Sequence, residues 1–102
     1  MTEAAPIPIR ILLVDGSEIM RRGITSVLSG HPGPTISVVG EAGTVAAAIN
    51  ICRDLRPDVV LLDIRLPDGS GFDACRRILQ ERPETRVVIL TSYSSDNSVY
   101  EA

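Results

Sequence analysis

Two acidic side chains and one hydroxyl side chain stand at the ends of short apolar runs in this sequence: Asp15, Asp63 and Thr91. Asp63 follows four consecutive Val and Leu residues, so its carboxylate is expected at the end of a buried strand. An ionised carboxylate in that position needs a cation, a hydrogen-bond donor or a metal ion to compensate its charge. If the runs are neighbouring parallel strands, their ends meet in one crevice, where open α/β sheets bind ligands. The three residues therefore predict a shared polar site.

Each of the three residues has a simpler interpretation when it is taken alone. An Asp after a strand, such as Asp15, can cap the next helix or begin a turn. A Thr at a strand end, such as Thr91, is favoured there by its β-branched side chain. Asp63 is harder to explain in this way, because a buried strand leads directly into it. The coincidence of all three residues at strand ends favours a functional site.

Four apolar runs rich in β-branched residues predict the strands that would position this site. They cover residues 9–15, 35–41, 58–64 and 86–92. Three of these runs contain a continuously apolar stretch, which is typical of strands covered on both faces. The pattern therefore indicates a parallel sheet with helices on both sides.

Helical periodicity fills the intervals between these runs, at residues 17–29, 44–55 and 71–82, and residues 96–102 begin a fourth helix. The alternation predicts a doubly wound α/β fold with right-handed crossovers. Ser17 and Thr44 are the expected N-caps of the first two helices. Each helix is expected to turn one apolar face toward the sheet. These faces are Met20, Ile24, Val27 and Leu28 in the first helix, Val45, Ala48, Ile49, Cys52 and Leu55 in the second, and Phe72, Cys75, Ile78 and Leu79 in the third.

Composition narrows the class of protein. The 102 residues suffice for one domain, and the net charge is -3 with ten Arg and no Lys, which argues against a surface that binds nucleic acid directly. The sequence shows no signal-peptide pattern and no apolar stretch that could span a bilayer, so a cytoplasmic location is expected. Cys52 and Cys75 fall in helical segments and are expected to be reduced, small core residues.

Three segments resemble the response-regulator receiver domains of two-component systems. VVLLDIRLPDGSG is similar to their phosphoacceptor segment, in which a Pro follows the Asp by four residues, as Pro67 follows Asp63. ILLVDGSEIMRRGI resembles the first strand with its acidic turn, and VVILTSY the fourth strand with its hydroxyl. The match is closest to NarL/LuxR-type regulators, whose receivers precede a helix-turn-helix domain. It covers about residues 9–102 and leaves 1–8 as an N-terminal extension.

The resemblance implies a flavodoxin-like parallel sheet of strand order 2-1-3-4 and a phosphoacceptor signalling domain, not an enzyme. Asp63 would accept a phosphoryl group from a sensor histidine kinase. Asp15, Asp63 and the backbone carbonyl of Arg65 would hold Mg²⁺. Thr91 would donate its hydroxyl to the phosphoryl group, and Arg65 and Tyr93 would modulate its loss. The resemblance further implies a homodimer that controls transcription through a DNA-binding domain outside this chain, and no membrane partner.

The sequence departs from the family pattern at two places. Gly16 stands where the family has a second acid, which is usually the direct metal ligand, so Mg²⁺ is expected to bind weakly and phosphotransfer to be slow. The fifth strand with its Lys, and the fifth helix, are missing, which indicates a C-terminally incomplete receiver with 87–90 at an exposed edge.

Two other functions are alternatives to a phosphorylated receiver. The first is a degenerate receiver that acts by dimerisation or protein binding without phosphate, and Gly16 is its main support. The second is a phosphatase with an aspartate nucleophile. Such enzymes place a second Asp two residues after the nucleophile, where this chain has Arg65, so the pattern disfavours it.

Overall fold

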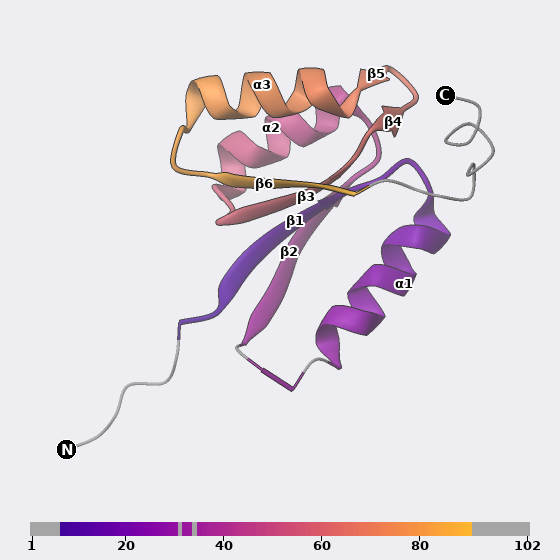
Figure 1. Cartoon of the computed structure of the whole chain (residues 1–102), viewed down its shortest axis with the longest axis vertical. Coiled ribbons are helices and arrows are strands. Elements are labelled where there is room, and N and C mark those ends of the chain that lie inside the picture. The colour runs from indigo at the N-terminus through magenta and orange to yellow at the C-terminus, as the bar shows by residue number, and fades with distance from the viewer. Residues whose placement is uncertain (1–6, 31, 34, 91–102) are drawn as a thin grey trace, which may run out of the picture.

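The computed structural model describes residues 7–30, 32–33 and 35–90. Thr91, Tyr93 and the helix expected at 96–102 lie outside the described residues. Figure 1 shows a twisted sheet with α1 on one side and α2 and α3 on the other. The elements in chain order are β1 (Ile9–Val14), α1 (Glu18–Ser29), β2 (Ile36–Ala42), α2 (Val45–Leu55), β3 (Val59–Asp63), β4 (Arg65–Leu66), β5 (Gly69–Ser70), α3 (Gly71–Glu81) and β6 (Arg86–Leu90).

The main sheet confirms the predicted doubly wound α/β fold. Its strands run in the order β2-β1-β3-β6, and each neighbouring pair is parallel. This is the predicted order 2-1-3-4, because β6 is the fourth long strand of the chain. Within the described part of the chain, β6 lies at one edge of the sheet, as expected for residues 87–90.

The pairing of the two central strands sets the position of the acidic residues. Val14 lies opposite Leu62 in the register of β1 and β3. Asp15 follows Val14, and Asp63, the last residue of β3, follows Leu62, so both lie at the carboxyl edge of the sheet. The sequence prediction that these two acids share one end of the sheet is therefore confirmed.

The hydrophobic core lies between the sheet and the pair of helices α2 and α3. Four consecutive residues of β1 are buried, as expected for a central strand. In β3, by contrast, buried and half-buried residues alternate, so the two faces of this strand are covered unequally. The core residues include Leu12, Val14, Val60 and Leu62 from the sheet, Ala48, Ile49 and Cys52 from α2, and Ala74 and Ile78 from α3.

Two of the predicted inward faces were wrong in part. No residue of α1 is fully buried, and Val27 is 73% exposed. The reason is that α1 packs mainly against β2 and is the helix covering its side of the sheet among the described residues. Phe72 is 55% exposed, whereas α3 buries Ile78, as predicted, together with Gly71 and Ala74, which were not predicted. Helical spacing thus indicated a face but not which of its apolar residues are covered.

Hydroxyl side chains begin the helices as predicted. The Ser17 hydroxyl accepts a hydrogen bond from the Met20 amide at 3.2 Å, and the Thr44 hydroxyl accepts one from the Ala47 amide at 3.0 Å. Each bond satisfies an amide that has no partner within its own helix. These caps fix where the chain turns after β1 and β2.

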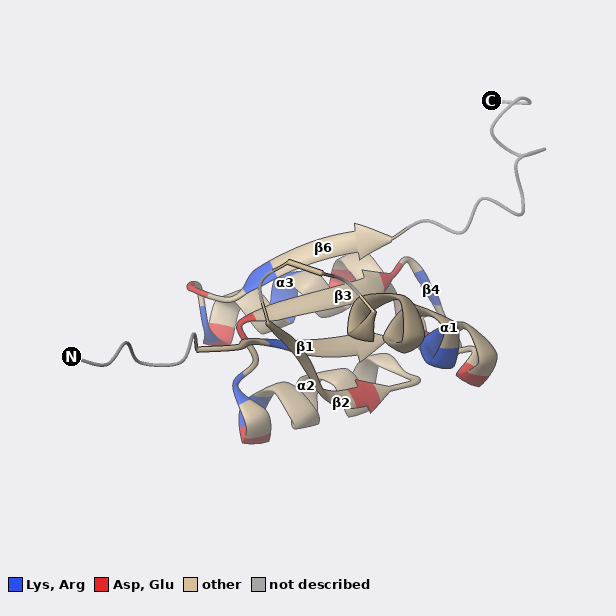
Figure 2. Cartoon of the chain, turned by 90° about the horizontal axis from the view of Figure 1, so that it is seen from below, with Lys and Arg blue, Asp and Glu red and all other residues tan. Residues whose placement is uncertain are grey.

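Two other features bear on the sequence predictions. Cys52 and Cys75 are both free, and burial raises the pKa of the Cys52 thiol to about 11. Arginines are spread over several elements of the fold (Figure 2). Among the described residues, no helix has the length and apolar character needed to cross a membrane.

Candidate functional site

An open pocket of about 390 Å³ lies at the carboxyl ends of β1 and β3. It brings together the two acids that the sequence predicted to meet, Asp15 and Asp63, with Arg65 beside them. The remaining lining residues are Gly16, Ser17, Met20, Leu66 and Pro67. Thr91, the predicted hydroxyl donor, and Tyr93 lie outside the described residues. The pocket is therefore built from the turn after β1 and the segment after β3.

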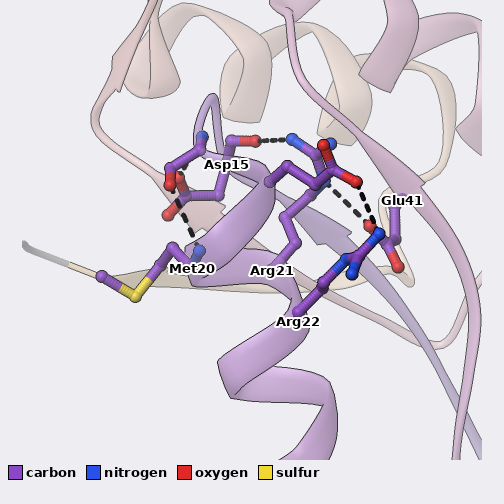
Figure 3. Close-up of polar contacts among 7 residues, drawn as sticks. Asp15, Met20, Arg21, Arg22 and Glu41 are labelled. Carbon is purple, nitrogen blue, oxygen red and sulfur yellow. Dashed lines mark hydrogen bonds and ion pairs between the residues drawn. The ribbon is translucent and has the colours of Figure 1, made fainter.

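Asp15 is held by backbone and side-chain contacts on several sides. Its amide donates to the carbonyl of Ala42 at 3.0 Å, which continues the pairing of β1 with β2. Its carboxylate accepts a hydrogen bond from the Ser17 amide at 2.8 Å. Its carbonyl accepts one from the guanidinium of Arg21 at 2.5 Å (Figure 3). Asp15 thus both shapes the turn, as its simpler interpretation expected, and faces the pocket.

Asp63 is half-buried at the end of β3, and the charge of Asp15 acts on its carboxyl group. Partial desolvation, and next the negative charge of Asp15, raise the pKa of Asp63 above its usual value. The nearby backbone amides of Arg65 and Ile64 and the charge of Arg65 act in the opposite direction. A carboxylate whose ionised form is disfavoured by a neighbouring acid makes a place where a cation is stabilised.

A close backbone contact holds the segment after Asp63. The Gly71 amide donates to the carbonyl of Ile64 at 2.6 Å, and a Cβ atom on Gly71 would overlap the carbonyl oxygen of Asp63. The residues between Ile64 and Gly71 form the short hairpin of β4 and β5, with a two-residue turn and with Leu66 opposite Gly69. The short hairpin and the glycine together return the chain to the sheet end, where α3 begins.

Asp68, at the tip of this hairpin, is a residue that the sequence analysis did not single out. Its two carboxylate oxygens accept hydrogen bonds from the amides of Val45 and Ala46, at 2.7 and 3.1 Å. These two amides lower the pKa of the Asp68 carboxyl. Asp68 therefore fastens the segment after the candidate phosphoacceptor to the start of α2. An Asp-Gly pair signals a turn, but nothing local signals a partner more than twenty residues away.

The acid that the family pattern leads one to expect after Asp15 is not replaced by a neighbour that lines the pocket. Glu18 instead forms an ion pair with Arg22 at 2.9 Å on the exposed side of α1. In the described ranges, no group of three or more His, Cys, Asp or Glu side chains is arranged to hold a metal ion. Mg²⁺, however, commonly binds through one or two carboxylates and completes its shell with water and other oxygens. Asp15 and Asp63 on an open pocket fit that requirement.

Comparison with known proteins agrees with the fold. The family model for the response regulator receiver domain matches residues 11–102. The DNA-binding transcriptional activator DevR/DosR of Mycobacterium tuberculosis is 46% identical over 92% of this chain and 42% of its own length. The response regulator protein VraR of Staphylococcus saprophyticus is 41% identical over 93% of this chain and 44% of its own length. The chain thus spans less than half the length of these curated relatives.

Solved structures of response regulators have the same fold. A LuxR-family two-component response regulator from Aurantimonas superposes with a TM-score of 0.77 and 32% identity, over 93% of this chain and 69% of that one. The signal receiver domain of the putative response regulator NarL from Mycobacterium tuberculosis gives a TM-score of 0.77 and 31% identity, over 84% of this chain and 68% of that one.

Proposed function

The chain belongs to the response regulator receiver domain family, and from this premise we propose that it accepts a phosphoryl group on Asp63 from a sensor histidine kinase. In this proposal residues 9–102 form the receiver and 1–8 precede it. The phosphoryl group controls transcription, in the cytoplasm, through a DNA-binding domain that is not among these residues. The receiver is a phosphoacceptor in signalling and not an enzyme, because its own side chain is the substrate of each transfer.

One observation carries the proposal: Asp63 opens onto a pocket that it shares with Asp15. A phosphoacceptor must be reachable by a bulky donor and must also be close to a second anion that can help to hold a cation. Asp63 meets both conditions, since it is only half-buried and its pKa responds to the charge of Asp15.

The chemistry follows from the residues at the pocket. A carboxylate oxygen of Asp63 attacks the phosphorus atom of a phosphohistidine, an O–P bond forms, and the P–N bond breaks with its electron pair leaving on the imidazole nitrogen. When bound, Mg²⁺ supplies positive charge that lets one anion approach another. Asp15, Asp63 and the backbone carbonyl of Arg65 are the groups that would hold it.

Further residues have supporting roles in this proposal. Thr91 would donate a hydrogen bond to a phosphoryl oxygen, and the side chains of Arg65 and Tyr93 would control the access of water to the phosphorylated Asp63. Arg65 is exposed beside the pocket, which suits that role.

The direct experiment is phosphorylation by a small donor. The full chain is incubated with acetyl phosphate or phosphoramidate and Mg²⁺, and intact mass is measured. We expect one added phosphoryl group in the wild type and none in Asp63→Asn. Asp73→Asn, which changes an exposed acid of α3, should still be modified. A wild-type chain that folds but gains no mass would overturn the proposal.

Gly16 favours a second candidate, a degenerate receiver that acts as a dimerisation or protein-binding module without phosphate. Glycine has no side chain, so Gly16 contributes no carboxylate at the position where the family usually has one. Sedimentation of the full chain before and after treatment with donor and Mg²⁺ distinguishes the two functions. A homodimer that is unchanged by the treatment favours the degenerate receiver, whereas a dimer that forms only after phosphorylation favours the first proposal.

A further inference from the structure

Arg21 links three parts of the fold next to the candidate site. It lies in the first half of α1, and its side chain is only 18% exposed. Its Nε donates to the carboxylate of Glu41 at 2.8 Å, near the end of β2. Its terminal nitrogen donates to the carbonyl of Asp15 at 2.5 Å (Figure 3). One side chain of α1 therefore ties the end of β2 to the turn that carries the predicted metal ligand.

The neighbouring Arg22 shows that this is not a general property of arginines on α1. Arg22 pairs with Glu18 at 2.9 Å, but both side chains are mostly exposed, at 76% and 64%. Such surface pairs contribute little to structure or stability. Arg21, in contrast, is enclosed on the side of Gly43, where an added Cβ atom would lie 3.4 Å from its guanidinium.

The contact of Arg21 with Asp15 involves the main chain and leaves the acidic side chain out. The guanidinium binds the carbonyl of Asp15, whereas the carboxylate receives the Ser17 amide at 2.8 Å. Glu41 supplies the negative charge that compensates Arg21. The arginine can therefore hold the peptide after Asp15 without taking the place of a cation at its carboxylate.

We propose that Arg21 is a positioning residue, which fixes the peptide of Asp15 so that its carboxylate faces Asp63 across the pocket. Its role in phosphotransfer rests on the function proposed above, but its effect on the turn does not. The planar guanidinium suits this task, because it can reach a carboxylate and a carbonyl at the same time, which an ammonium group on a flexible stem does poorly.

The test compares Arg21→Ala with the matched control Arg22→Ala in the full chain. Two quantities are measured by NMR: the affinity for Mg²⁺, by titration, and the hydrogen-exchange rate of the Ser17 amide without metal. We expect Arg21→Ala to weaken Mg²⁺ binding about tenfold, the usual effect of losing a residue that orients a metal ligand, and to speed exchange at Ser17. Arg22→Ala should stay within about twofold of the wild type in both quantities.

Arg21→Lys keeps the charge and should move both measurements in the same direction by a smaller factor. It also serves as the deciding variant should Arg21→Ala fail to fold. Wild-type Mg²⁺ affinity together with wild-type exchange at Ser17 in the folded Arg21 variants would overturn the positioning role. A wild-type chain that binds no Mg²⁺ counts against the proposed function alone, because the exchange rate at Ser17 still decides for or against Arg21.

Discussion

Asp15 lies close enough to Asp63 across the pocket that its negative charge raises the pKa of the Asp63 carboxyl, in addition to the effect of burial. The folded state therefore disfavours the ionised form of Asp63 relative to the unfolded chain. By linkage, the stability that this shift contributes is fully present at pH values below the ordinary pKa of an aspartate, about 3.9. The relative stability is lost as the pH rises through the higher pKa of the folded state.

The first prediction follows from that sign. Asp63→Asn removes a carboxylate that is ionised unfavourably at neutral pH, so the variant should unfold at a higher urea concentration than the wild type at pH 7. Asp15→Asn should act in the same direction, by removing the charge that faces Asp63. The advantage of both variants should shrink as the pH is lowered toward the ordinary pKa. Urea titrations at several pH values without Mg²⁺ measure it, and a lower midpoint for Asp63→Asn at pH 7 would contradict the assignment.

The second prediction concerns Gly16, where the family pattern has an acid. Gly16 is outside the left-handed backbone region, and an added Cβ atom would lie 3.4 Å from the ring of Pro67. A side chain can therefore be accommodated with a small movement of the proline. Gly16→Asp should strengthen Mg²⁺ binding on the order of tenfold, because it adds a carboxylate to the pocket.

The matched control for that experiment is Gly23→Asp on the exposed side of α1, where an added Cβ atom meets nothing within 4 Å. It adds the same charge away from the pocket and should leave the dissociation constant for Mg²⁺ almost unchanged. Equal gains in both variants would mean that net charge, and not the pocket, determines binding. Calorimetric titration at fixed ionic strength makes the comparison.

The third prediction tests the hydrogen bonds between Asp68 and α2. Asp68→Ala leaves the amides of Val45 and Ala46 without their acceptors, so the urea midpoint should fall. Since these amides lower the pKa of Asp68, the stabilisation is present above the ordinary pKa of an aspartate and is lost as the pH falls through the lower folded value. The difference between wild type and Asp68→Ala should thus vanish in acid.

Asp54→Ala is the control for this prediction, because Asp54 is exposed near the far end of the same helix. It should not lower the midpoint. Asn at position 68 keeps one acceptor oxygen, so Asp68→Asn should fall between Asp68→Ala and the wild type and lose most of the pH dependence. An unchanged midpoint in Asp68→Ala would show that the start of α2 does not depend on this carboxylate.

The predictable part of the site rests on strand pattern and register. Apolar runs indicated four parallel strands, and the parallel pairing of Val14 with Leu62 then necessarily brings the next residues, Asp15 and Asp63, to one edge. The residues that the sequence analysis missed form hydrogen bonds with partners far away in the sequence. Arg21 and Asp68 reach partners 20 or more residues away, so their spacing carries no helical or strand period that local reasoning can detect. The same limit explains why α1 was expected to bury Val27, since periodicity does not say how much of a face is covered.

The fourth prediction concerns Gly71, whose position only the three-dimensional packing explains. Any side chain at this residue would overlap the carbonyl oxygen of Asp63, and the Gly71 amide is already bound to Ile64. Gly71→Ala must therefore push the end of β3 away from α3, at a cost of about 1–3 kcal/mol, typical of overpacking in a closely packed region. Gly23→Ala, in the open middle of α1, should instead stabilise the chain by about 0.5–1 kcal/mol, because alanine favours helices. Opposite shifts of the two urea midpoints are the expected result.

Because the displaced oxygen belongs to Asp63 itself, Gly71→Ala should also slow phosphorylation by acetyl phosphate, whereas Gly23→Ala should not. If the Gly71→Ala chain is as stable and as readily phosphorylated as the wild type, the prediction is wrong. The carbonyl of Asp63 would then move aside for the added methyl group without cost to stability or to phosphorylation.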